Sequence, residues 1–367
     1  MTGLESRIAA TLTWQEARTG GEAVATALEA ARGASEEVVD LLSGADEVIL
    51  TGAGSSLYLA QALAWTFREA TGRAAMAVPL SEYLLRPDGV VTGPAGRRPV
   101  VVVSRSGSTS EAVTVARMSI ARGHPTIAIT CRAGSPLAAA AHGALVSRDG
   151  DEEAIVMTRS FTSMLALGLR VVARVAGSER LARDLDALPD RWEETEPAIA
   201  VAATLAARSW SRVVSLGGGG ARAIASETTL KLIETSRIQA DAYEPFEFRH
   251  GPISVCEPGV LVIALPGDPG TDAELRVVTE ARALGSSIWI LGPVAGGFEL
   301  PFDTLRSAPG TPPGDLTVSS IGVGLHHAAR LPLLMPALQA FAVGLALTRD
   351  CDPDRPRHLS QVVVLDG

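Results

Sequence analysis

The sequence predicts an α/β protein of two similar domains, each with a parallel sheet covered by helices on both faces. Short apolar segments of strand length alternate with amphipathic segments of helix length, and several of the short segments end in turns rich in glycine or serine. Strands and helices that alternate in this way form parallel sheets. The whole pattern occurs twice, which indicates a tandem arrangement.

The first half contains the clearest elements. Strands are predicted at 47–51, 99–103 and 126–130, and helices at 57–70 and 110–122. The strands are rich in valine and isoleucine, which favour the extended backbone. The first strand ends at a glycine turn (52–56) and the second at a serine-rich loop (104–109).

The second half repeats this order. Strands are predicted at 212–216, 260–265 and 287–291, and helices at about 221–236 and 272–284. Equivalent positions lie 160 to 165 residues apart, as in Val48 and Val213. The chain is therefore divided into a helical arm (1–34), a first domain (35–175), a polar linker (176–199), a second domain (200–347) and a tail (348–367).

Composition bounds the class of function. The net charge is −9, so neither nucleic acid nor an anionic membrane is the expected partner. The three cysteines form no closely spaced pair, which is typical of a reducing cytoplasm and argues against a metal knuckle. No signal peptide is recognised, and the most apolar stretch, 331–347, is interpreted as a buried helix because prolines interrupt it.

Lysine usage is unusual. Among the 32 lysine and arginine residues only Lys231 is a lysine, and asparagine is absent. One interpretation is the codon bias of a GC-rich genome. The other is a chemical role, because arginine cannot supply a compact, titratable ammonium.

The turns at the carboxyl ends of the strands are the candidate binding sites, because parallel sheets bind ligands there. In the turn after the first strand, Leu57 stands where a dinucleotide-binding turn needs its third glycine, which argues against NAD or FAD. The segment Ser104–Ser110 offers five hydroxyls and a guanidinium at the start of a helix, without the Gly-Lys-Ser/Thr of a nucleotide P-loop. A monophosphate fits this segment, and a polar helix cap is the simpler alternative.

The second domain contains the candidate catalytic groups. Glu227, Lys231 and Glu234 are spaced so that they share one face of a helix. A surface stripe of ion pairs is the alternative, although the neighbouring residues are apolar. His250 precedes Gly251-Pro252, a rigid turn that can present an imidazole.

Together these motifs resemble the sugar isomerase (SIS) family in its double-domain form, over about residues 35–367. Similar proteins are the isomerase half of glucosamine-6-phosphate synthase, the galactosamine-6-phosphate deaminase/isomerases and the fructosamine-6-phosphate deglycases. The motifs that carry the resemblance are Gly52–Ser56, Ser104–Thr109, Met157–Thr162, Glu227…Lys231…Glu234, Glu247–Pro252 and Asp354–Ser360. The resemblance implies two tandem flavodoxin-like (SIS) three-layer α/β/α domains.

The resemblance also implies roles for single residues. The sugar phosphate would be bound by Ser56, Ser104, Ser106, Thr109 and the backbone of Arg105 and Gly107, and Ser55 would contact the sugar hydroxyls. Glu234 would be the base that moves a proton between C1 and C2, supported by Glu227 and Lys231. His250 would help to open the ring, reaching in from the partner subunit of a homodimer. No metal or organic cofactor is needed, because a carboxylate can catalyse an enolisation once the phosphate is anchored.

The sequence departs from the family at three places. The arm is too short for a glutaminase domain and has no N-terminal nucleophilic cysteine, so glutamine-dependent synthesis is not expected. Gln361 stands where the family's tail, which folds over the sugar, has a lysine, and it cannot form a Schiff base. The second-domain loop, 266–271, lacks the serines of the first, so one phosphate site per chain is expected.

The leading hypothesis is a cytoplasmic phosphosugar isomerase or deaminase that acts on a hexose or amino-sugar 6-phosphate. One alternative is a fructosamine-6-phosphate deglycase, which uses the same base and differs in the group that leaves. The other, from a different class, is a non-catalytic sugar-phosphate-binding regulator. The presence of Glu234 and His250, and an arm too short for a partner module, favour an enzyme.

Overall fold

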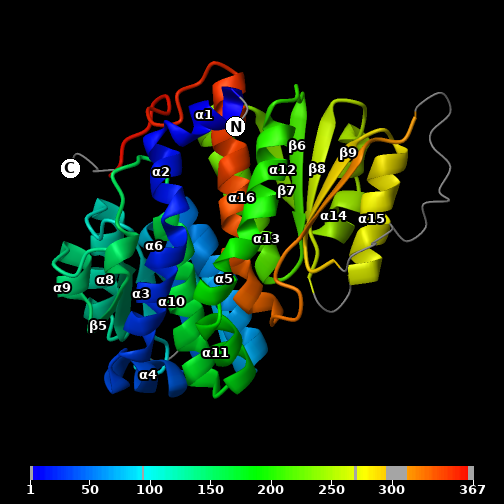
Figure 1. Cartoon of the computed structure of the whole chain (residues 1–367). Helices are drawn as coiled ribbons and strands as arrows, with labels where there is room; N and C mark the ends of the chain where they lie inside the picture. The colour runs from blue at the N-terminus through cyan, green and yellow to red at the C-terminus, as the bar shows by residue number, and fades with distance from the viewer. Residues whose placement is uncertain (1–2, 93–94, 268–270, 295–311, 363–367) are drawn as a thin grey trace. The chain divides into compact units, whose positions relative to one another are not determined.

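A computed structural model of the chain describes residues 3–92, 95–267, 271–294 and 312–362 (Figure 1). It divides into two compact units, and each is described by itself. The first-repeat unit comprises residues 16–190 and 358–367, and the second-repeat unit comprises residues 1–15 and 191–357. The domain boundaries expected from the sequence stay a prediction, and parts of the loop 266–271, the arm and the tail (268–270, 1–2 and 363–367) lie outside the described residues.

The first-repeat unit contains a parallel sheet that, in its described residues, has five strands in the order β2-β1-β3-β4-β5. The strands are β1 (Glu47–Gly52), β2 (Ala74–Pro79), β3 (Val100–Val103), β4 (Thr126–Thr130) and β5 (Gly143–Val146). The helices are α3 (Gly20–Arg32), α4 (Glu36–Ser43), α5 (Ser55–Thr71), α6 (Leu80–Leu85), α7 (Pro87–Val90), α8 (Ser110–Ala121), α9 (Pro136–Ala140), η1 (Arg148–Gly150), α10 (Arg159–Ala176) and α11 (Glu179–Asp186).

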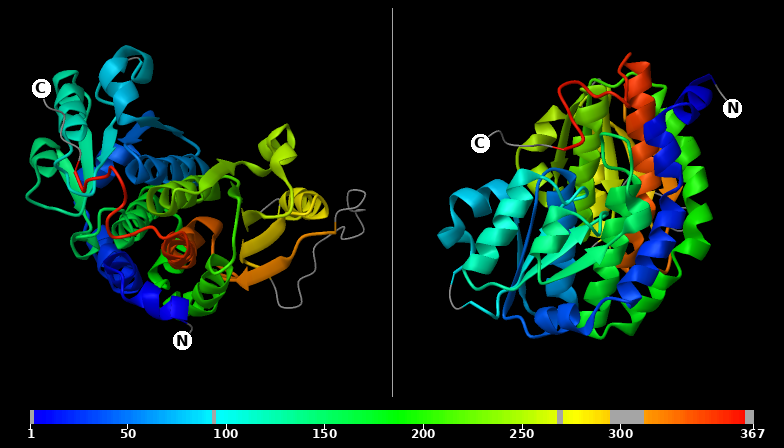
Figure 2. Two further views of the ribbon diagram at one scale, coloured as in Figure 1. Left: turned by 90° about the horizontal axis from the view of Figure 1, so that it is seen from above. Right: turned by 90° about the vertical axis from the view of Figure 1, so that its left-hand side faces the viewer.

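Both faces of this sheet are buried. Side chains alternate along each strand, so neighbouring residues pack into different layers. Val48 and Leu50 of β1 face α5 and α10, where they meet Leu63 and Val171. Ile49, between them, belongs to the core beneath α6 and α8. The result is a three-layer sandwich with helices on both sides (Figure 2).

The second-repeat unit contains the corresponding sheet, which in its described residues has five strands in the order β7-β6-β8-β9-β10. The strands are β6 (Arg212–Gly217), β7 (Gln239–Tyr243), β8 (Val260–Leu265), β9 (Ser287–Gly292) and β10 (Leu316–Ser320). The helices are α1 (Gly3–Ala9), α12 (Glu196–Ala206), α13 (Gly220–Ser236), α14 (Pro245–Arg249), η3 (Pro252–Val255), α15 (Thr271–Ala283) and α16 (His327–Thr348), while α2 (Leu12–Arg18) and η2 (Pro189–Thr195) each contain residues of both units.

Helices cover both faces of this sheet as well: α14 and α15 lie on one side and α12, α13 and α16 on the other (Figure 1). By length and composition α16 could cross a membrane, but 89% of its apolar window is buried within the protein. The aromatic pair of Trp289 on β9 and Phe341 on α16, with ring centroids 5.8 Å apart, ties this helix to the sheet. The stretch 331–347 is therefore a core helix, as the sequence analysis expected.

The two sheets share the flavodoxin-like strand order, with the first strand inside the second, which confirms the predicted fold class. The turns that follow β1 and β6 agree closely: Gly54 has φ 54° and ψ −128°, and Gly219 has φ 57° and ψ −130°. The helices that follow, α5 and α13, have 17 residues each. The repeat seen in the sequence is therefore a repeat of backbone geometry.

Candidate active site

Both sheets reverse their strand order between two central strands, and ligands of this fold bind at that point. In the first-repeat unit the reversal lies between β1 and β3. The glycine turn therefore leads into α5 there, and the serine loop, residues 104–109, leads into α8. This places the two predicted phosphate-binding segments at the carboxyl ends of adjacent strands.

The serine loop is buried although it is polar. Ser104 and Ser106 are each 5% exposed. Their hydroxyls accept hydrogen bonds from backbone N–H groups of the loop itself, Ser104 Oγ from Gly107 at 3.2 Å and Ser106 Oγ from Ser108 at 3.1 Å. Ser104 Oγ also lies 3.4 Å from Thr109 Oγ1. The loop is thus a compact turn whose hydroxyls converge before the first turn of α8.

Glycine is required at Gly107. Its φ is +59°, and a Cβ there would lie 2.1 Å from Ser135 Oγ. A side chain would therefore be strained in its backbone conformation and would collide with the neighbouring turn. In the glycine turn, Ser55 and Ser56 start α5 and are likewise buried, at 4% and 5% exposed.

The side chain of Arg105 points into the protein rather than toward a ligand. Its Nη1 donates to Ala154 O at 2.9 Å and lies 3.6 Å from Glu152 Oε1. Its Nη2 donates to Ile155 O at 3.3 Å and to Gln361 O at 3.1 Å. The guanidinium counted with the loop hydroxyls in the sequence analysis is therefore already engaged, and only the Arg105 backbone remains for the proposed phosphate.

Glu152 is a residue of this site that the sequence analysis missed. Its side chain is fully buried and accepts hydrogen bonds from the N–H of Thr158, at 2.9 Å, and from the hydroxyls of Thr158 and Ser160. Burial raises the pKa of its carboxyl, against the lowering effect of Arg105 and of these donors. The available signal was an acidic run, Asp151–Glu153, shortly after a short strand.

Gln361 anchors the tail to the same network. Its Nε2 donates to Glu152 O at 2.8 Å, and its carbonyl accepts from Arg105 at 3.1 Å. Gln361 therefore holds the tail beside the serine loop through two hydrogen bonds.

In the second-repeat unit, Glu227, Lys231 and Glu234 lie together on α13. Lys231 Nζ is 3.6 Å from Glu227 Oε1 and hydrogen-bonds to Glu234 Oε2. The side chains of Glu227 and Lys231 are 0% and 4% exposed, whereas that of Glu234 is 19% exposed. The alternative of a surface ion-pair stripe is therefore wrong.

The structure does not bring His250 to this cluster: in the described part of the chain, no hydrogen bond or ion pair joins it to Glu227, Lys231 or Glu234. His250 is exposed at the end of α14, and its N–H donates to Glu247 O at 3.1 Å. It precedes Gly251, whose φ is +133°, a conformation that needs glycine. The imidazole is thus presented on a turn at the protein surface.

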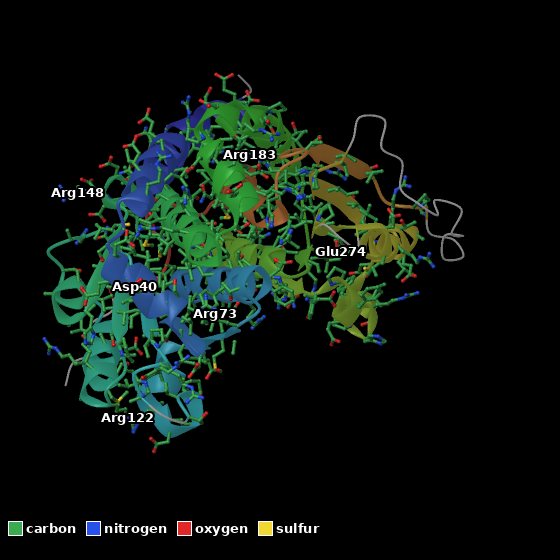
Figure 3. All side chains as sticks on the ribbon, turned by 90° about the horizontal axis from the view of Figure 1, so that it is seen from below. Asp40, Arg73, Arg122, Arg148, Arg183 and Glu274 are labelled. Atoms are coloured by element: carbon green, nitrogen blue, oxygen red, sulfur yellow. The ribbon has the colours of Figure 1, made fainter. Side chains whose placement is uncertain are left out.

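The second-repeat unit has no serine loop at its strand reversal. Glu274 of α15 (Figure 3) instead accepts a hydrogen bond from the N–H of Gly267 at 3.0 Å. A Cβ at Gly218 would lie 2.6 Å from Glu274 Oε1, so the carboxylate lies against the glycine turn. Within the described residues, no group of three or more His, Cys, Asp or Glu could hold a metal ion.

Comparison with known proteins agrees with the fold. The SIS domain matches residues 41–174 and 207–292. The isomerizing glutamine–fructose-6-phosphate aminotransferases of Pyrobaculum aerophilum and Aeropyrum pernix are each 29% identical, over 90% and 89% of this chain but 53% and 52% of their own length. The chain thus spans about half the length of these relatives.

Solved structures extend the comparison over nearly the whole chain. Glucosamine-6-phosphate deaminase from Thermotoga maritima has a TM-score of 0.75 at 25% identity, covering 97% of this chain and 100% of that one. Tagatose-6-phosphate ketose/aldose isomerase from Escherichia coli shares the fold, with a TM-score of 0.81 at 22% identity, over 94% of this chain and 95% of that one. Since the family match covers both repeats, the chain belongs to the SIS domain family.

Proposed function

We propose that the protein is an isomerase or deaminase of a hexose or amino-sugar 6-phosphate, with Glu234 as the base that transfers a proton between C1 and C2. The observation that carries the proposal is the buried cluster on α13. An ammonium lies between two carboxylates, one closed off and one open to a ligand.

The difference in exposure between Glu227 and Glu234 supports these roles. Glu227, with no exposed surface, holds Lys231 in place and cannot itself reach a substrate. Glu234 is the accessible carboxylate, and the bond from Lys231 Nζ orients it. A base must lie within reach of the proton that it removes, whatever its pKa. Glu234 is therefore the group that we propose for the proton transfer between C1 and C2.

The phosphate group of the substrate would orient the sugar in the site. The serine loop would bind it through the hydroxyls of Ser104, Ser106 and Thr109 and the N–H groups at the start of α8. Binding energy from a phosphate remote from C1 and C2 can position the reacting carbons. His250 would open the sugar ring in the site of a partner subunit of a homodimer, which fits its exposure on a single chain.

The residue at position 361 favours an enzyme that does not use a tail lysine. Gln361 is bonded to Glu152 and Arg105 and offers no amine. The resemblance to the glucosamine-6-phosphate deaminase of Thermotoga maritima, at 25% identity over 97% of this chain, supports an amino-sugar phosphate as one substrate class.

The test is a panel of hexose, hexosamine and fructosamine 6-phosphates, assayed for aldose–ketose interconversion and for released ammonia or amine. We expect turnover of at least one hexose or hexosamine 6-phosphate. Glu234→Gln should lower it by about 10²- to 10⁴-fold, the usual effect of losing a general base, while substrate binding changes only a few-fold.

The other outcomes have distinct readings. Release of a free amino compound from fructosamine 6-phosphates alone would mean a deglycase. Tight binding of a sugar phosphate with no turnover by the unmutated protein would mean a regulator and would overturn the proposal. An unchanged rate in Glu234→Gln would remove Glu234 from the mechanism even if the substrate class is right.

A further inference from the structure

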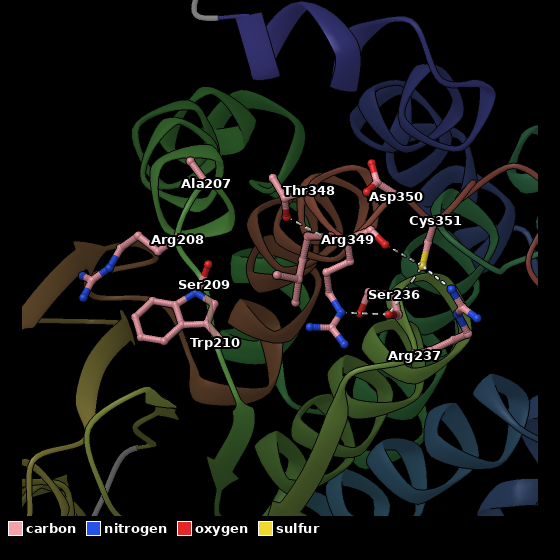
Figure 4. A pocket seen from close by; sticks show the side chains of 11 residues that line it. Ala207, Arg208, Ser209, Trp210, Ser236, Arg237, Thr348, Arg349, Asp350 and Cys351 are labelled. Atoms are coloured by element: carbon pink, nitrogen blue, oxygen red, sulfur yellow. Dashed lines mark hydrogen bonds between the residues drawn. The ribbon is translucent and has the colours of Figure 1, made fainter.

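A cleft of about 590 Å³ opens in the second-repeat unit where three helices end together (Figure 4). Its walls are residues 207–210 after α12, 236–237 at the end of α13, and 348–351 at the end of α16, with Leu345. The volume is in the range of small-molecule sites. Nothing in the proposed reaction uses this cleft.

Three guanidiniums line the cleft, against one carboxylate, Asp350. Arg208 forms an ion pair with Asp315 at 2.9 Å. Arg349 Nε donates to Ser236 O at 3.1 Å, and Arg237 Nη2 donates to Cys351 Sγ at 3.2 Å. Two of the three cations are thus held by neutral groups and, among the described residues, form no ion pair with a carboxylate.

The backbone at Arg237 shows that this side chain occupies a position that favours glycine. Arg237 ends α13 with φ 55° and ψ 25°, a left-handed conformation that disfavours side chains. The equivalent residue at the end of α5 in the first repeat is Gly72, with φ 69°. The chain therefore has a strained arginine where its own repeat has an unstrained glycine.

The same occurs on the other wall of the cleft. Asp350, just after α16, has φ 54°. In the described part of the chain only Arg237, Asp350 and His358 have a positive φ without being glycine, and two of these three line the cleft. A left-handed residue is a common way to end a helix, but at these two ends the position is held by a charged side chain instead of glycine.

We propose that this cleft is a second anion site, which binds a small organic phosphate through Arg237 and Arg349. Guanidinium groups bind phosphate oxygens with paired N–H donors and keep their charge at any physiological pH. Ser236 and Arg237 follow Glu234 on the same helix, so the occupant would contact the end of α13. The site is independent of the proposed reaction and of the serine loop.

Cys351 provides a direct probe of occupancy. Its thiol lies beside Arg237 and is partly exposed, whereas Cys131 is 2% exposed. Burial raises the pKa of the thiols of Cys131 and Cys256, which makes both poor nucleophiles toward iodoacetamide. The alkylation rate of Cys351, followed by peptide mass spectrometry, therefore reports on the cleft without any assay of turnover.

The experiment uses inorganic phosphate as the probe, and then glucose 6-phosphate, in the Ser106→Ala background so that binding at the serine loop is weakened. Chloride is added to matched ionic strength as the reference. We expect saturating phosphate to slow alkylation of Cys351 by about threefold or more, since the protection follows the occupied fraction. A larger effect of glucose 6-phosphate at equal concentration would show that the organic part also binds.

Two glycine variants separate the charge from the strain. Arg237→Gly and Asp350→Gly both relieve a left-handed residue and should both raise the unfolding temperature. Protection by phosphate should disappear in Arg237→Gly and persist or increase in Asp350→Gly. If phosphate gives no protection in the Ser106→Ala background, or protects Arg237→Gly equally, the arginines only cap helix ends and the proposal is wrong.

Discussion

At the scale of a single residue, the surroundings of Lys231 bear on why the chain has one lysine, for which codon bias and a chemical role are the two explanations. Its ammonium is 4% exposed and contacts the carboxylates of Glu227 and Glu234. A compact cation fits between two carboxylates that lie about one turn before and one turn after it on the same helix, whereas a planar guanidinium is larger and fixes its donors in a fork. The geometry therefore favours the chemical explanation.

We expect Lys231→Arg to lower turnover at least tenfold, about 1.4 kcal/mol in the barrier, because Glu234 loses its orientation. The measurement is kcat together with the unfolding temperature. Arg212→Lys, which alters another partly buried ion pair of the same unit, is the matched control and should keep nearly full activity. A fully active Lys231→Arg would make the lone lysine an accident of codon usage.

Ser106 gives the corresponding prediction for the serine loop. Removing one hydroxyl donor to a charged group costs about 1.5–3 kcal/mol, so Ser106→Ala should weaken binding of a sugar 6-phosphate at least tenfold. Calorimetric titration of phosphorylated and unphosphorylated sugar measures this. Thr114→Ala, further along α8 at an exposed hydroxyl, should leave the affinity unchanged, and equal binding of both sugars by the unmutated protein would exclude the site.

At the scale of elements, the central strands were predictable and the edges were not. The predicted strands 126–130 and 260–265 match β4 and β8, and the others differ by one residue at an end. The edge strands β2, β5, β7 and β10 were missed. Half of the residues of β2, AAMAVP, are alanine, which has little preference for strands. β5, GALV, has only four residues.

The candidate site divides in the same way. Residues that act through their local spacing, such as the α13 cluster, could be read from the sequence. Glu152 and the direction of the Arg105 side chain could not, because they depend on a contact with Gln361 that spans 256 positions. The residues around Arg105 in the sequence do not indicate which distant segment provides the carbonyl that accepts its hydrogen bond.

The contact between tail and serine loop leads to a prediction for an element. Gln361→Ala removes the hydrogen bond to Glu152 O, so the tail should detach more often and become a better trypsin substrate after the exposed Arg357. The rate of cleavage there should rise several-fold with the unfolding temperature unchanged. Ser360→Ala, whose hydroxyl bonds only within the tail, should be cleaved at the wild-type rate, and equal cleavage of both variants would mean that Gln361 does not hold the tail.

At the scale of the whole molecule, the proposed homodimer predicts complementation. If His250 acts in the site of the partner subunit, a mixture of inactive Glu234→Gln and His250→Ala chains recovers activity after co-refolding. Random pairing of two chains should restore about a quarter of the sites, since half of the dimers are mixed and each has one intact site. Absence of any recovery, with dimers present by light scattering, would place His250 and Glu234 of one chain in the same site.

The carboxylate of Glu274 gives the two repeats different dependence on metabolites. A folded unit that binds a ligand is stabilised by a free energy that, once the ligand is in excess, rises with the logarithm of the ligand concentration. The turn at Gly218 and Gly267 already has an anion covalently attached to the chain, whose effective concentration is constant. The glycine turn of the second repeat is therefore filled by a carboxylate of the chain itself as soon as it folds, whereas occupancy of the proposed phosphate site at the serine loop would follow the concentration of sugar phosphate.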